Sequence, residues 1–428
     1  MKTLLRGRVL SFQRAPEYAD DTNAYIYICD GAVVLENGAI SEIGEYSDLK
    51  GTGREIDHRP HLILPGFIDP HLHFPQAQVV GSYAAELLDW LNDHTFPEEM
   101  KFEDPVHANR IANAFFDQLL AHGTTTAVAF CSSSPVSVDA YFEEAQKRSM
   151  RVIGGKTMMD RNAPDGLCDT AQSGYDDTKQ LIERWDGVDR LDYAITPRFA
   201  ITSSEAQLKA TGALVKEFPD LHIQTHLSEN DTEIELTAKL FPNARDYLDI
   251  YDSYNLLGPK TLMGHAIHLS EAERKRMSET GTVAVHCPTS NLFLGSGLFD
   301  LFGLEAQGIR TAVATDIGGG TSWSMLRTLD EAYKIQQMRR QRLNPLKSIY
   351  WATLGNAQAL GLEDKIGTLD AGTEADLIVV DSSATPAMAL RMERVETLVQ
   401  ELFVLQTMGD DRSIVKTYVA GQDSSETA

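Results

Sequence analysis

Histidine and aspartate side chains follow several apolar runs of the sequence, at points where a buried strand is expected to end. His71 and His73 form an H-x-H pair at the end of one run, His226 ends a second, and Asp316 follows a third. Residues two apart on an extended chain project from the same face, so the H-x-H pair can bind one cation together. Three imidazoles and one carboxylate suit Zn2+, with Fe2+ or Mn2+ as alternatives. These side chains therefore predict a metal site.

A metal site of this kind predicts a hydrolysis. Bound Zn2+ lowers the pKa of water from ~15.7 to ~7 and so supplies a nucleophile at neutral pH. Glu229 lies three residues after His226, where a loop carboxylate can carry a proton from that water to a leaving group. His265, at the end of another apolar run, is expected to hold or polarise the attacking water. Asp316 is expected to accept a proton as well as to bind the metal, so Glu229, His265 and Asp316 are the predicted catalytic residues.

Other residues capable of similar chemistry are interpreted differently. No lysine stands near the end of the run at 191–197, so a two-metal site bridged by a carbamate is not expected. Lys156 is interpreted as structural, and Cys287 and Asn291 are expected to shape the mouth of the site. Several further histidines are interpreted as structural, namely His94, His107, His122, His222 and His286.

Eight apolar, β-branched runs alternate with helix-period segments between about residue 62 and residue 340. In the segment 105–123, Ile111, Phe115 and Leu119 recur every four residues and define one buried stripe. The alternation predicts an α/β protein built on a (β/α)8 TIM-like barrel, whose catalytic residues lie at the carboxyl ends of the strands. The strands are expected at 61–69, 124–130, 151–159, 191–197, 221–226, 261–268, 281–286 and 309–315.

Short β-like runs flank this region at both ends of the chain. The first flank contains Asn37-Gly38, a dipeptide typical of tight β-hairpins. We expect the two flanks to combine into one small β-sandwich lobe beside the barrel. The predicted domain segments are 1–61 and 366–428 for the lobe and 62–365 for the barrel.

The composition restricts the classes of partner. The 428-residue chain carries 38 basic and 62 acidic residues, a formal net charge of −24, which disfavours a polynucleotide because its binding needs clustered Lys and Arg. An uncharged nucleobase meets no such barrier. The four cysteines form no C-x-x-C pair, and the sequence contains neither a signal-peptide pattern nor an apolar run of ~18 residues. We expect a cytoplasmic protein that binds neither nucleic acid nor membrane.

Several longer strings carry a resemblance to known proteins. PGFIDPHLH, THLSE, GHAIHLS and ATDIGGG resemble the amidohydrolase superfamily of metal-dependent hydrolases. HFPQAQ, LLDWLNDHTFPEE, GKTMMDRNAPD, ITPRFAITSS and HCPTSNLFLGSGLFD resemble its guanine deaminase family, over a similarity that runs from about residue 62 to residue 415. The resemblance implies a homodimer that hydrolyses guanine to xanthine and ammonia. It also implies one Zn2+ per subunit, bound by His71, His73, His226 and Asp316.

The same resemblance implies how a purine would be held. Gln76 and Arg198 would hydrogen-bond the edge of the base, and Phe199 would cover an apolar face. A few fixed polar groups around a stacking surface can recognise a flat base in this way. In the implied reaction, water attacks carbon C2 while Glu229 delivers a proton to N3. The full set of expected substrate contacts is His73, Phe74, Pro75, Gln76, Arg198, Phe199, His226 and Asp316.

Two alternatives remain open. A related aminohydrolase would use the same metal site on a modified guanine, a pteridine, cytosine or a chlorinated triazine, and Gln76, Arg198 and Phe199 are the residues that would distinguish these substrates. The other alternative is a catalytically inactive barrel that acts as a scaffold. Such proteins usually lose metal ligands, whereas this chain retains every candidate.

Overall fold

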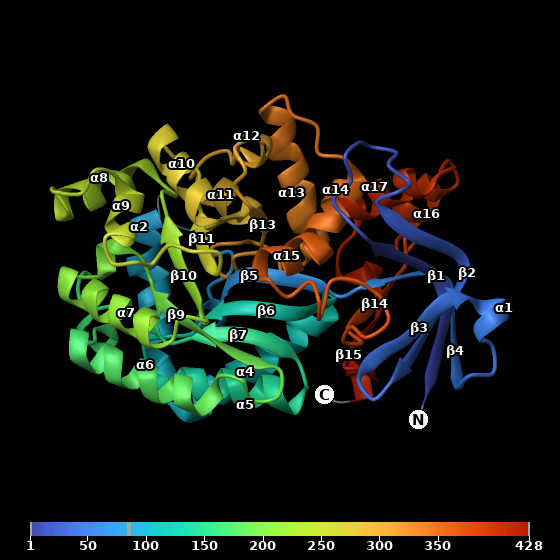
Figure 1. The fold of residues 1–428 in the computed structure, drawn as a ribbon, viewed down its shortest axis with the longest axis horizontal. Coiled ribbons are helices and arrows are strands. Elements are labelled where there is room, and N and C mark those ends of the chain that lie inside the picture. Colours follow the sequence, from blue (N-terminus) through green and yellow to red (C-terminus); the bar gives the residue numbers. More distant parts are fainter. Residues whose placement is uncertain (1, 84–86, 427–428) are drawn as a thin grey trace.

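A ring of parallel strands surrounded by helices dominates the computed structural model, which describes residues 2–83 and 87–426 (Figure 1). Within these residues, eight strands neighbour one another in the order β5, β6, β7, β9, β10, β11, β12, β13, and the short strand β8 pairs with β9 outside that path. The predicted (β/α)8 barrel is confirmed. The strands are β5 (Phe67–His73), β6 (Thr124–Phe130), β7 (Arg151–Gly155), β8 (Thr157–Met158), β9 (Leu191–Pro197), β10 (His222–Leu227), β11 (Thr261–His265), β12 (Val283–His286) and β13 (Thr311–Val313).

Hydrogen bonds from the Asn356 side chain and between backbone groups close the barrel between β5 and the end of β13. Asn356 donates through Nδ2 to the carbonyl oxygens of Ile68 at 2.7 Å and Val313 at 2.8 Å. The backbone N–H of Asp316 donates to the carbonyl oxygen of His71 at 3.0 Å. The first and last strands therefore meet where two of the predicted metal ligands lie.

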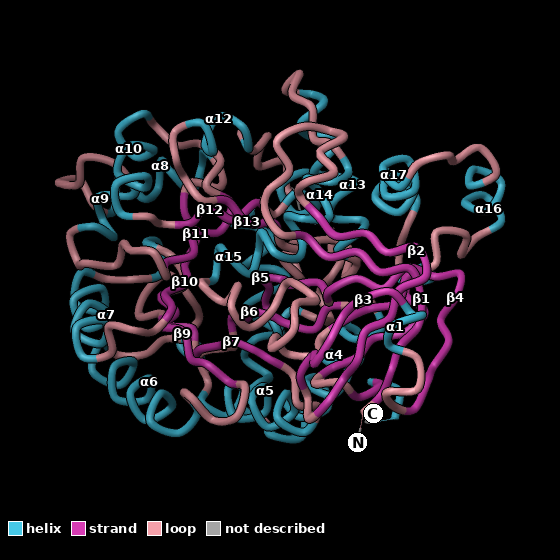
Figure 2. Tube along the Cα trace, turned by 45° about the vertical axis from the view of Figure 1, so that its right-hand side comes forward, coloured by secondary structure: helices cyan, strands magenta, loops and turns pink. Residues whose placement is uncertain are grey.

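Helices cover the outside of the barrel (Figure 2). In α4, Ile111, Phe115 and Leu119 are buried on one face, as the helical period predicts, and Asp104 caps the helix by accepting the N–H of Val106 at 2.9 Å. The longer helices are α4 (Pro105–Ala121), α5 (Pro135–Lys147), α6 (Ala171–Trp185), α7 (Glu205–Glu217), α8 (Asp231–Leu240), α10 (Glu271–Thr280), α13 (Met325–Met338) and α17 (Leu398–Met408). The shorter helices are α1 (Tyr46–Leu49), α2 (Leu87–Trp90), α3 (Phe96–Glu99), α9 (Tyr247–Asp252), α11 (Pro288–Phe293), α12 (Leu301–Ala306), α14 (Pro345–Tyr350), α15 (Asn356–Leu360) and α16 (Pro386–Met392). Among the described helices, none combines the length and the apolar character needed to cross a bilayer.

Both ends of the chain build a lobe beside the barrel, as predicted, and its described strands belong to a single sheet where a sandwich was expected (Figure 1). In the described residues its seven strands form one hydrogen-bonded sheet in the order β16, β15, β14, β4, β1, β2, β3. Asn37 and Gly38 join β2 to β3 with φ values of 52° and 82°, which confirms the predicted tight hairpin because such turns need positive φ at both positions. The strands are β1 (Thr3–Phe12), β2 (Tyr25–Glu36), β3 (Ala39–Glu45), β4 (Arg54–Pro65), β14 (Leu377–Val380), β15 (Ile414–Val419) and β16 (Gln422–Asp423).

The predicted strand 61–69 is wrong as a single strand. β4 continues to Pro65 in the lobe, and β5 begins at Phe67 in the barrel. A Cβ on the intervening Gly66 would overlap Oγ1 of Thr125, so the chain passes between the two sheets at a position where a side chain does not fit. A continuous apolar run does not reveal that its two halves serve different sheets.

Other predicted boundaries also differ from the structure. The predicted strand 151–159 is divided between β7 and β8 at Lys156, and the predicted strand 261–268 ends at His265. The φ of 66° at His265 is left-handed and interrupts the extended backbone. β4 crosses the predicted domain boundary after residue 61. The division into 1–61, 62–365 and 366–428 stays a prediction.

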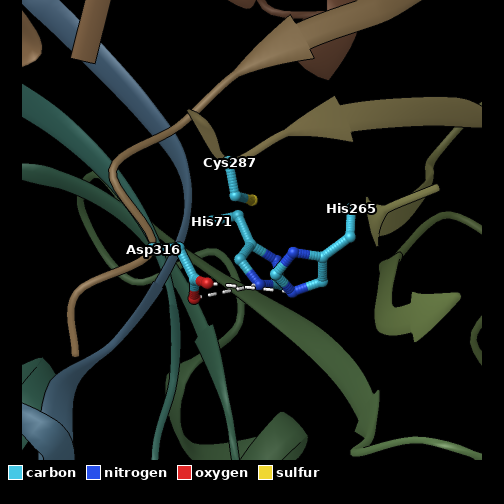
Figure 3. Close-up of side chains that lie close together, drawn as sticks. All are labelled: His71, His265, Cys287 and Asp316. Carbon is cyan, nitrogen blue, oxygen red and sulfur yellow. Dashed lines mark ion pairs between the residues drawn. The ribbon is translucent and has the colours of Figure 1, made fainter. Parts of the chain in front are cut away.

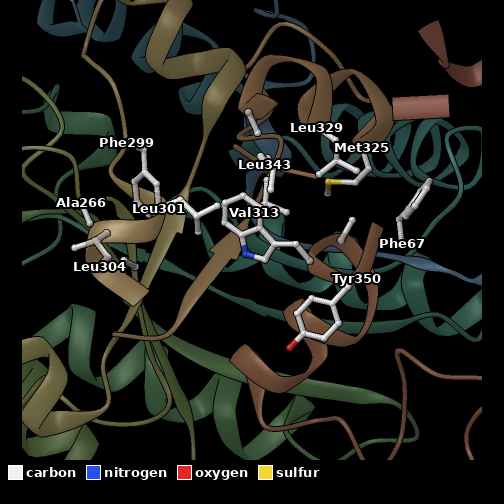
Figure 4. Close-up of a cluster of buried hydrophobic side chains, with 14 of the residues drawn as sticks. Phe67, Ala266, Phe299, Leu301, Leu304, Val313, Met325, Leu329, Leu343 and Tyr350 are labelled. Atoms are coloured by element: carbon white, nitrogen blue, oxygen red, sulfur yellow. The ribbon is translucent and has the colours of Figure 1, made fainter. Parts of the chain in front are cut away.

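One hydrophobic core extends from the barrel into the lobe. Leu10 and Leu64 of the lobe strands belong to the same buried cluster as Val313 of the barrel and Leu329 of α13. Figure 4 shows part of this cluster, where Val313, Leu329 and their neighbours fill the space between β13 and the surrounding helices. Because burial of apolar surface is the main favourable term in folding, the shared cluster holds the lobe against the barrel.

Candidate metal and substrate site

The four predicted metal ligands meet at the carboxyl end of the barrel. His71 and His73 come from the end of β5, His226 from β10, and Asp316 from the loop after β13. Nε2 of His73 lies 3.2 Å from Nε2 of His226 and 3.3 Å from Oδ1 of Asp316. Nε2 of His71 lies 3.5 Å from the same oxygen of Asp316. The structure therefore brings all four side chains together.

The surroundings of these side chains fit a bound cation. Both ring nitrogens of His71 are buried without a hydrogen-bond partner among the described residues, which is costly unless a further group binds them. Burial lowers the pKa values of His71, His73 and His226, so their rings are neutral and offer lone pairs. Burial opposes ionisation of Asp316, but its hydrogen bond to His73 and the charge of His265 hold its pKa below the ordinary range. Three neutral imidazoles and one carboxylate match a divalent metal such as zinc.

Cys287 lies beside two of these side chains (Figure 3). Potential ligand atoms of His71, His265, Cys287 and Asp316 all lie within 4.8 Å of one another. Burial raises the pKa of the Cys287 thiol well above its ordinary value, so the sulfur keeps its proton. Because metals bind the thiolate, Cys287 fits the wall of the site better than the ligand set.

His265 connects the predicted catalytic carboxylates. Its Nε2 lies 3.3 Å from Oε2 of Glu229 and 3.7 Å from Oδ2 of Asp316, while its Nδ1 lies 2.9 Å from Oδ1 of Asn291. Burial alone would lower the pKa of His265, but Glu229, Asp316 and the hydrogen bond to Asn291 together raise it. A protonated ring donates through both nitrogens, one toward the carboxylates and the other to Asn291. Asn291, which was predicted at the mouth of the site, therefore hydrogen-bonds Nδ1 of the predicted catalytic residue His265.

Glu229 lies in the loop after β10 and is almost fully buried. Burial raises its pKa to about 7, so the carboxyl can both accept and release a proton at neutral pH. Oγ of Ser296 donates to its Oε1 at 2.8 Å. Oε2 of Glu233 accepts the backbone N–H groups of Glu229 at 2.8 Å and Asn230 at 3.2 Å, which anchors the loop. Hydrogen bonds to the side chain and to the backbone thus fix Glu229 in the site.

A cavity lies against these groups. Besides His73, His226, Glu229, His265 and Asp316, its polar lining includes Gln76, Arg198 and Ser290. Its apolar lining consists of Leu87, Trp90, Leu91, Phe199 and Leu294. A cavity with apolar walls and a few fixed polar groups suits a small, flat, uncharged ligand.

Gln76 and Arg198, the predicted contacts to the base edge, both line this cavity. Each donates a hydrogen bond to the buried carboxylate of Glu99, a residue that the sequence reasoning missed. The three positions are far apart in the chain and follow no common spacing, so no motif reveals their contact. The available signal was the presence of Glu99 in LLDWLNDHTFPEE, one of the strings that carry the resemblance.

Phe74 and Pro75 do not line the cavity. The ring of Phe74 packs against Phe102 and Phe115, with ring centroids 5.1 and 5.4 Å apart, and lies in the core beneath α4. Packing of Phe115 of α4 against this ring directs Phe74 away from the cavity. Both residues therefore lie outside the cavity lining, and their expected direct contact with the substrate stays a prediction.

Two residues interpreted as structural have partners that support that interpretation. The ring of His286 stacks on Phe299 with centroids 4.5 Å apart, and burial lowers its pKa to about 3. Nζ of Lys156 forms a 2.6 Å ion pair with Oδ2 of Asp169. Neither residue lines the cavity.

A parallel barrel with a set of potential metal ligands at the ends of its strands is the arrangement expected of a metal-dependent hydrolase, and comparison with known families agrees. The model of the amidohydrolase family matches residues 62–422, which is most of the chain. The chain therefore belongs to the amidohydrolase family.

Within this family, the chain is similar in sequence and structure to several proteins named guanine deaminases. Guanine deaminase of Escherichia coli strain K12 is 46% identical over 423 residues, covering 98% of this chain and 96% of the relative. The solved structure of E. coli guanine deaminase superimposes with a TM-score of 0.96, covering 98% of this chain and 99% of that chain. A structure of guanine deaminase from C. acetobutylicum with guanine in its active site gives a TM-score of 0.89 at 29% identity, covering 99% of this chain and 100% of that chain. The resemblance carried by the sequence strings is confirmed.

Proposed function

We propose that the protein hydrolyses guanine to xanthine and ammonia, with one Zn2+ per subunit bound by His71, His73, His226 and Asp316. The observation that carries this proposal is the convergence of three neutral, buried imidazoles and one carboxylate at a cavity that Glu229 also lines. The similarity to guanine deaminases over nearly the whole chain supports guanine as the substrate.

The reaction requires two proton transfers that Glu229 is suited to make. When bound, zinc would supply the Lewis-acid chemistry that makes water nucleophilic at neutral pH. Glu229 takes a proton from the water and delivers it to N3 of guanine as the bond between the water oxygen and C2 forms. His265 and Asp316 hold the water toward C2. The C2–NH2 bond then breaks, a proton from the new C2 hydroxyl passes through Glu229 to the leaving amine, and xanthine and ammonia result.

The base is held by polar groups at its edge and by apolar side chains at its faces. Gln76 and Arg198 hydrogen-bond one edge of the base, and Phe199 contributes an apolar surface beside His226, with ring centroids 6.3 Å apart. His73, His226 and Asp316 lie at the reacting side of the base. Phe74 and Pro75 act only through the short turn that carries Gln76.

We also propose that the active form is a cytoplasmic homodimer. The four cysteines are unpaired in the structure, which a reducing compartment permits. The dimer rests on the family resemblance, and sedimentation equilibrium of the purified protein measures it directly. A particle with the mass of one chain at micromolar concentration would contradict the dimer.

The deciding experiment measures conversion of guanine to xanthine by the purified, zinc-loaded protein, with and without a chelator. We expect equal amounts of xanthine and ammonia, loss of both when the metal is removed, and recovery when Zn2+ is returned. Elemental analysis on the same sample is expected to give one zinc per chain.

A panel of heterocycles assayed for ammonia release separates the alternatives. A pteridine, cytosine or a triazine that reacts faster than guanine by a wide margin would overturn the proposed substrate. A protein that holds no stoichiometric metal and releases no ammonia from any of these compounds would instead be a scaffold.

A further inference from the structure

We propose that Glu99 is a positioning residue that determines substrate specificity. Its carboxylate fixes the Gln76 amide and the Arg198 guanidinium so that the cavity presents one hydrogen-bond acceptor beside one donor. Such a pair can hydrogen-bond a ligand that carries a ring N–H next to a carbonyl group. It cannot hydrogen-bond a ligand that carries an unprotonated ring nitrogen next to an amino group. The inference rests on the proposed function, because it assigns the edge of the purine that these side chains read.

Glu99 reaches the site from the helical segment that forms part of the cavity wall. The segment comprises α2, a π-helical stretch at Leu91–Thr95, and α3, which ends at Glu99. Leu87, Trp90 and Leu91 of this segment line the cavity, and Glu99 is only 2% exposed. Local π-helical turns occur frequently at functional sites. One segment therefore supplies part of the apolar lining of the cavity and the carboxylate that binds the polar side chains Gln76 and Arg198.

The carboxylate determines which end of the Gln76 side chain faces the cavity. Nε2 of Gln76 donates to Oε1 of Glu99 at 2.9 Å. A carboxylate only accepts hydrogen bonds, so a flipped amide would bring two oxygens together. Oε1 of Gln76 is consequently directed away from Glu99, and it is buried without a partner among the described residues. An unpaired, buried acceptor in a cavity wall is the group that a ligand N–H would satisfy.

The same carboxylate fixes Arg198. Nη1 of Arg198 lies 2.9 Å from Oε1 and 2.8 Å from Oε2 of Glu99. The guanidinium group also lies over the ring of Phe96, with Cζ 5.4 Å from the ring centroid. The backbone carbonyl oxygen of Arg198 accepts a hydrogen bond from Nδ1 of His226 at 2.7 Å. Because a guanidinium is planar and carries its donors in a fixed fork, these contacts set the direction of the N–H groups that face the cavity.

The resulting pattern matches one edge of guanine. Its N1–H would donate to Oε1 of Gln76, and its C6 carbonyl oxygen would accept from Arg198. In 2,6-diaminopurine the same two positions are an unprotonated nitrogen and an amino group, so both polarities are reversed while the amino group at C2 is retained. Sites built to hydrogen-bond a substrate strongly reject an analogue that leaves their buried polar groups unpaired.

The test compares guanine with 2,6-diaminopurine in the zinc-loaded wild type and in Glu99→Gln. The new amide can donate to Gln76, which permits Gln76 to turn its own N–H2 group toward the ligand. We expect the ratio of kcat/KM for guanine to kcat/KM for 2,6-diaminopurine to fall at least tenfold, mainly through KM for guanine. The double variant Glu99→Gln with Gln76→Glu is expected to recover most of the ratio, because residue 76 then offers only acceptors.

Glu144 supplies a matched control outside the cavity. Like Glu99, it is a buried carboxylate that accepts from an amide, Nδ2 of Asn113 at 3.3 Å, and pairs with an arginine, Arg148. Glu144→Gln is expected to lower the melting temperature without changing the ratio of the two bases. If Glu99→Gln lowers kcat/KM for both bases by the same factor, Glu99 is structural and the inference is overturned.

Binding separates failure of this inference from failure of the proposed function. Isothermal titration with xanthine, which has the same N1–H and C6 carbonyl, and with 2,6-diaminopurine gives a ratio of affinities that needs no turnover. A wild type that does not deaminate guanine refutes the proposed function. An affinity ratio that is unchanged in Glu99→Gln refutes the role of Glu99, whether or not guanine is turned over.

Discussion

Glu229→Gln removes the proposed proton carrier and leaves its surroundings in place. The amide keeps the length of the side chain, and its oxygen can still accept the 2.8 Å hydrogen bond from Oγ of Ser296. A positioned general acid–base group contributes ~10²- to 10⁴-fold in rate. At ~1.36 kcal/mol for each factor of ten, that range corresponds to about 2.7–5.4 kcal/mol of activation free energy. We expect kcat for guanine to fall within this range while the melting temperature stays close to that of the wild type.

The pH dependence of kcat/KM gives the sharper readout of the same variant. The free enzyme needs the carboxylate form of Glu229 to accept a proton from water, and burial raises the pKa of this group to about 7. Below that pH the carboxyl is protonated, so kcat/KM of the wild type is expected to fall about tenfold for each further pH unit. Xanthine formation measured from pH 5 to pH 9 tests this. A Glu229→Gln variant that keeps the wild-type rate across this range would refute the reasoning.

Three further changes have defined outcomes. Asn291→Ala leaves Nδ1 of His265 without its 2.9 Å partner, so kcat is expected to fall ~10-fold or more with zinc content unchanged; an unchanged kcat would show that Asn291 does not position the ring. His71→Ala removes one of the proposed ligands, and elemental analysis is expected to find much less than one zinc per chain, whereas full occupancy would remove His71 from the ligand set. Burial opposes ionisation of Glu374, but its hydrogen bond to Arg151 and the charge of Arg190 lower its pKa, so the stabilisation is present above the ordinary glutamate range and is lost as pH falls below it. The melting temperature of Glu374→Gln should therefore depend less on pH between 5 and 3 than that of the wild type, and parallel curves would contradict this.

The convergence of the proposed metal ligands could be predicted from the sequence because their positions follow from local geometry. An extended chain repeats every two residues, so the spacing of His71 and His73 alone places both on one face. The alternation of strands and helices places His226 and Asp316 at the same end of a barrel, since parallel strands all point the same way. The hairpin at Asn37 is local in the same sense, because its conformation depends on that residue and the glycine after it.

Contacts between distant segments were decided only by the tertiary structure. Glu99 contacts Gln76 and Arg198 from a helical segment that contains a π-helical stretch, which shifts the helical period. A sequence period within one element also does not show which faces of different elements pack together. The direction of Phe74 into the core depends likewise on α4 packing beneath it. The sequence by itself therefore determined the fold class and the convergence of the proposed metal ligands, which depend on periodicity along single elements. The orientation of the groups proposed to hydrogen-bond the base depends on packing across the molecule, and a period along one element carries no information about that packing.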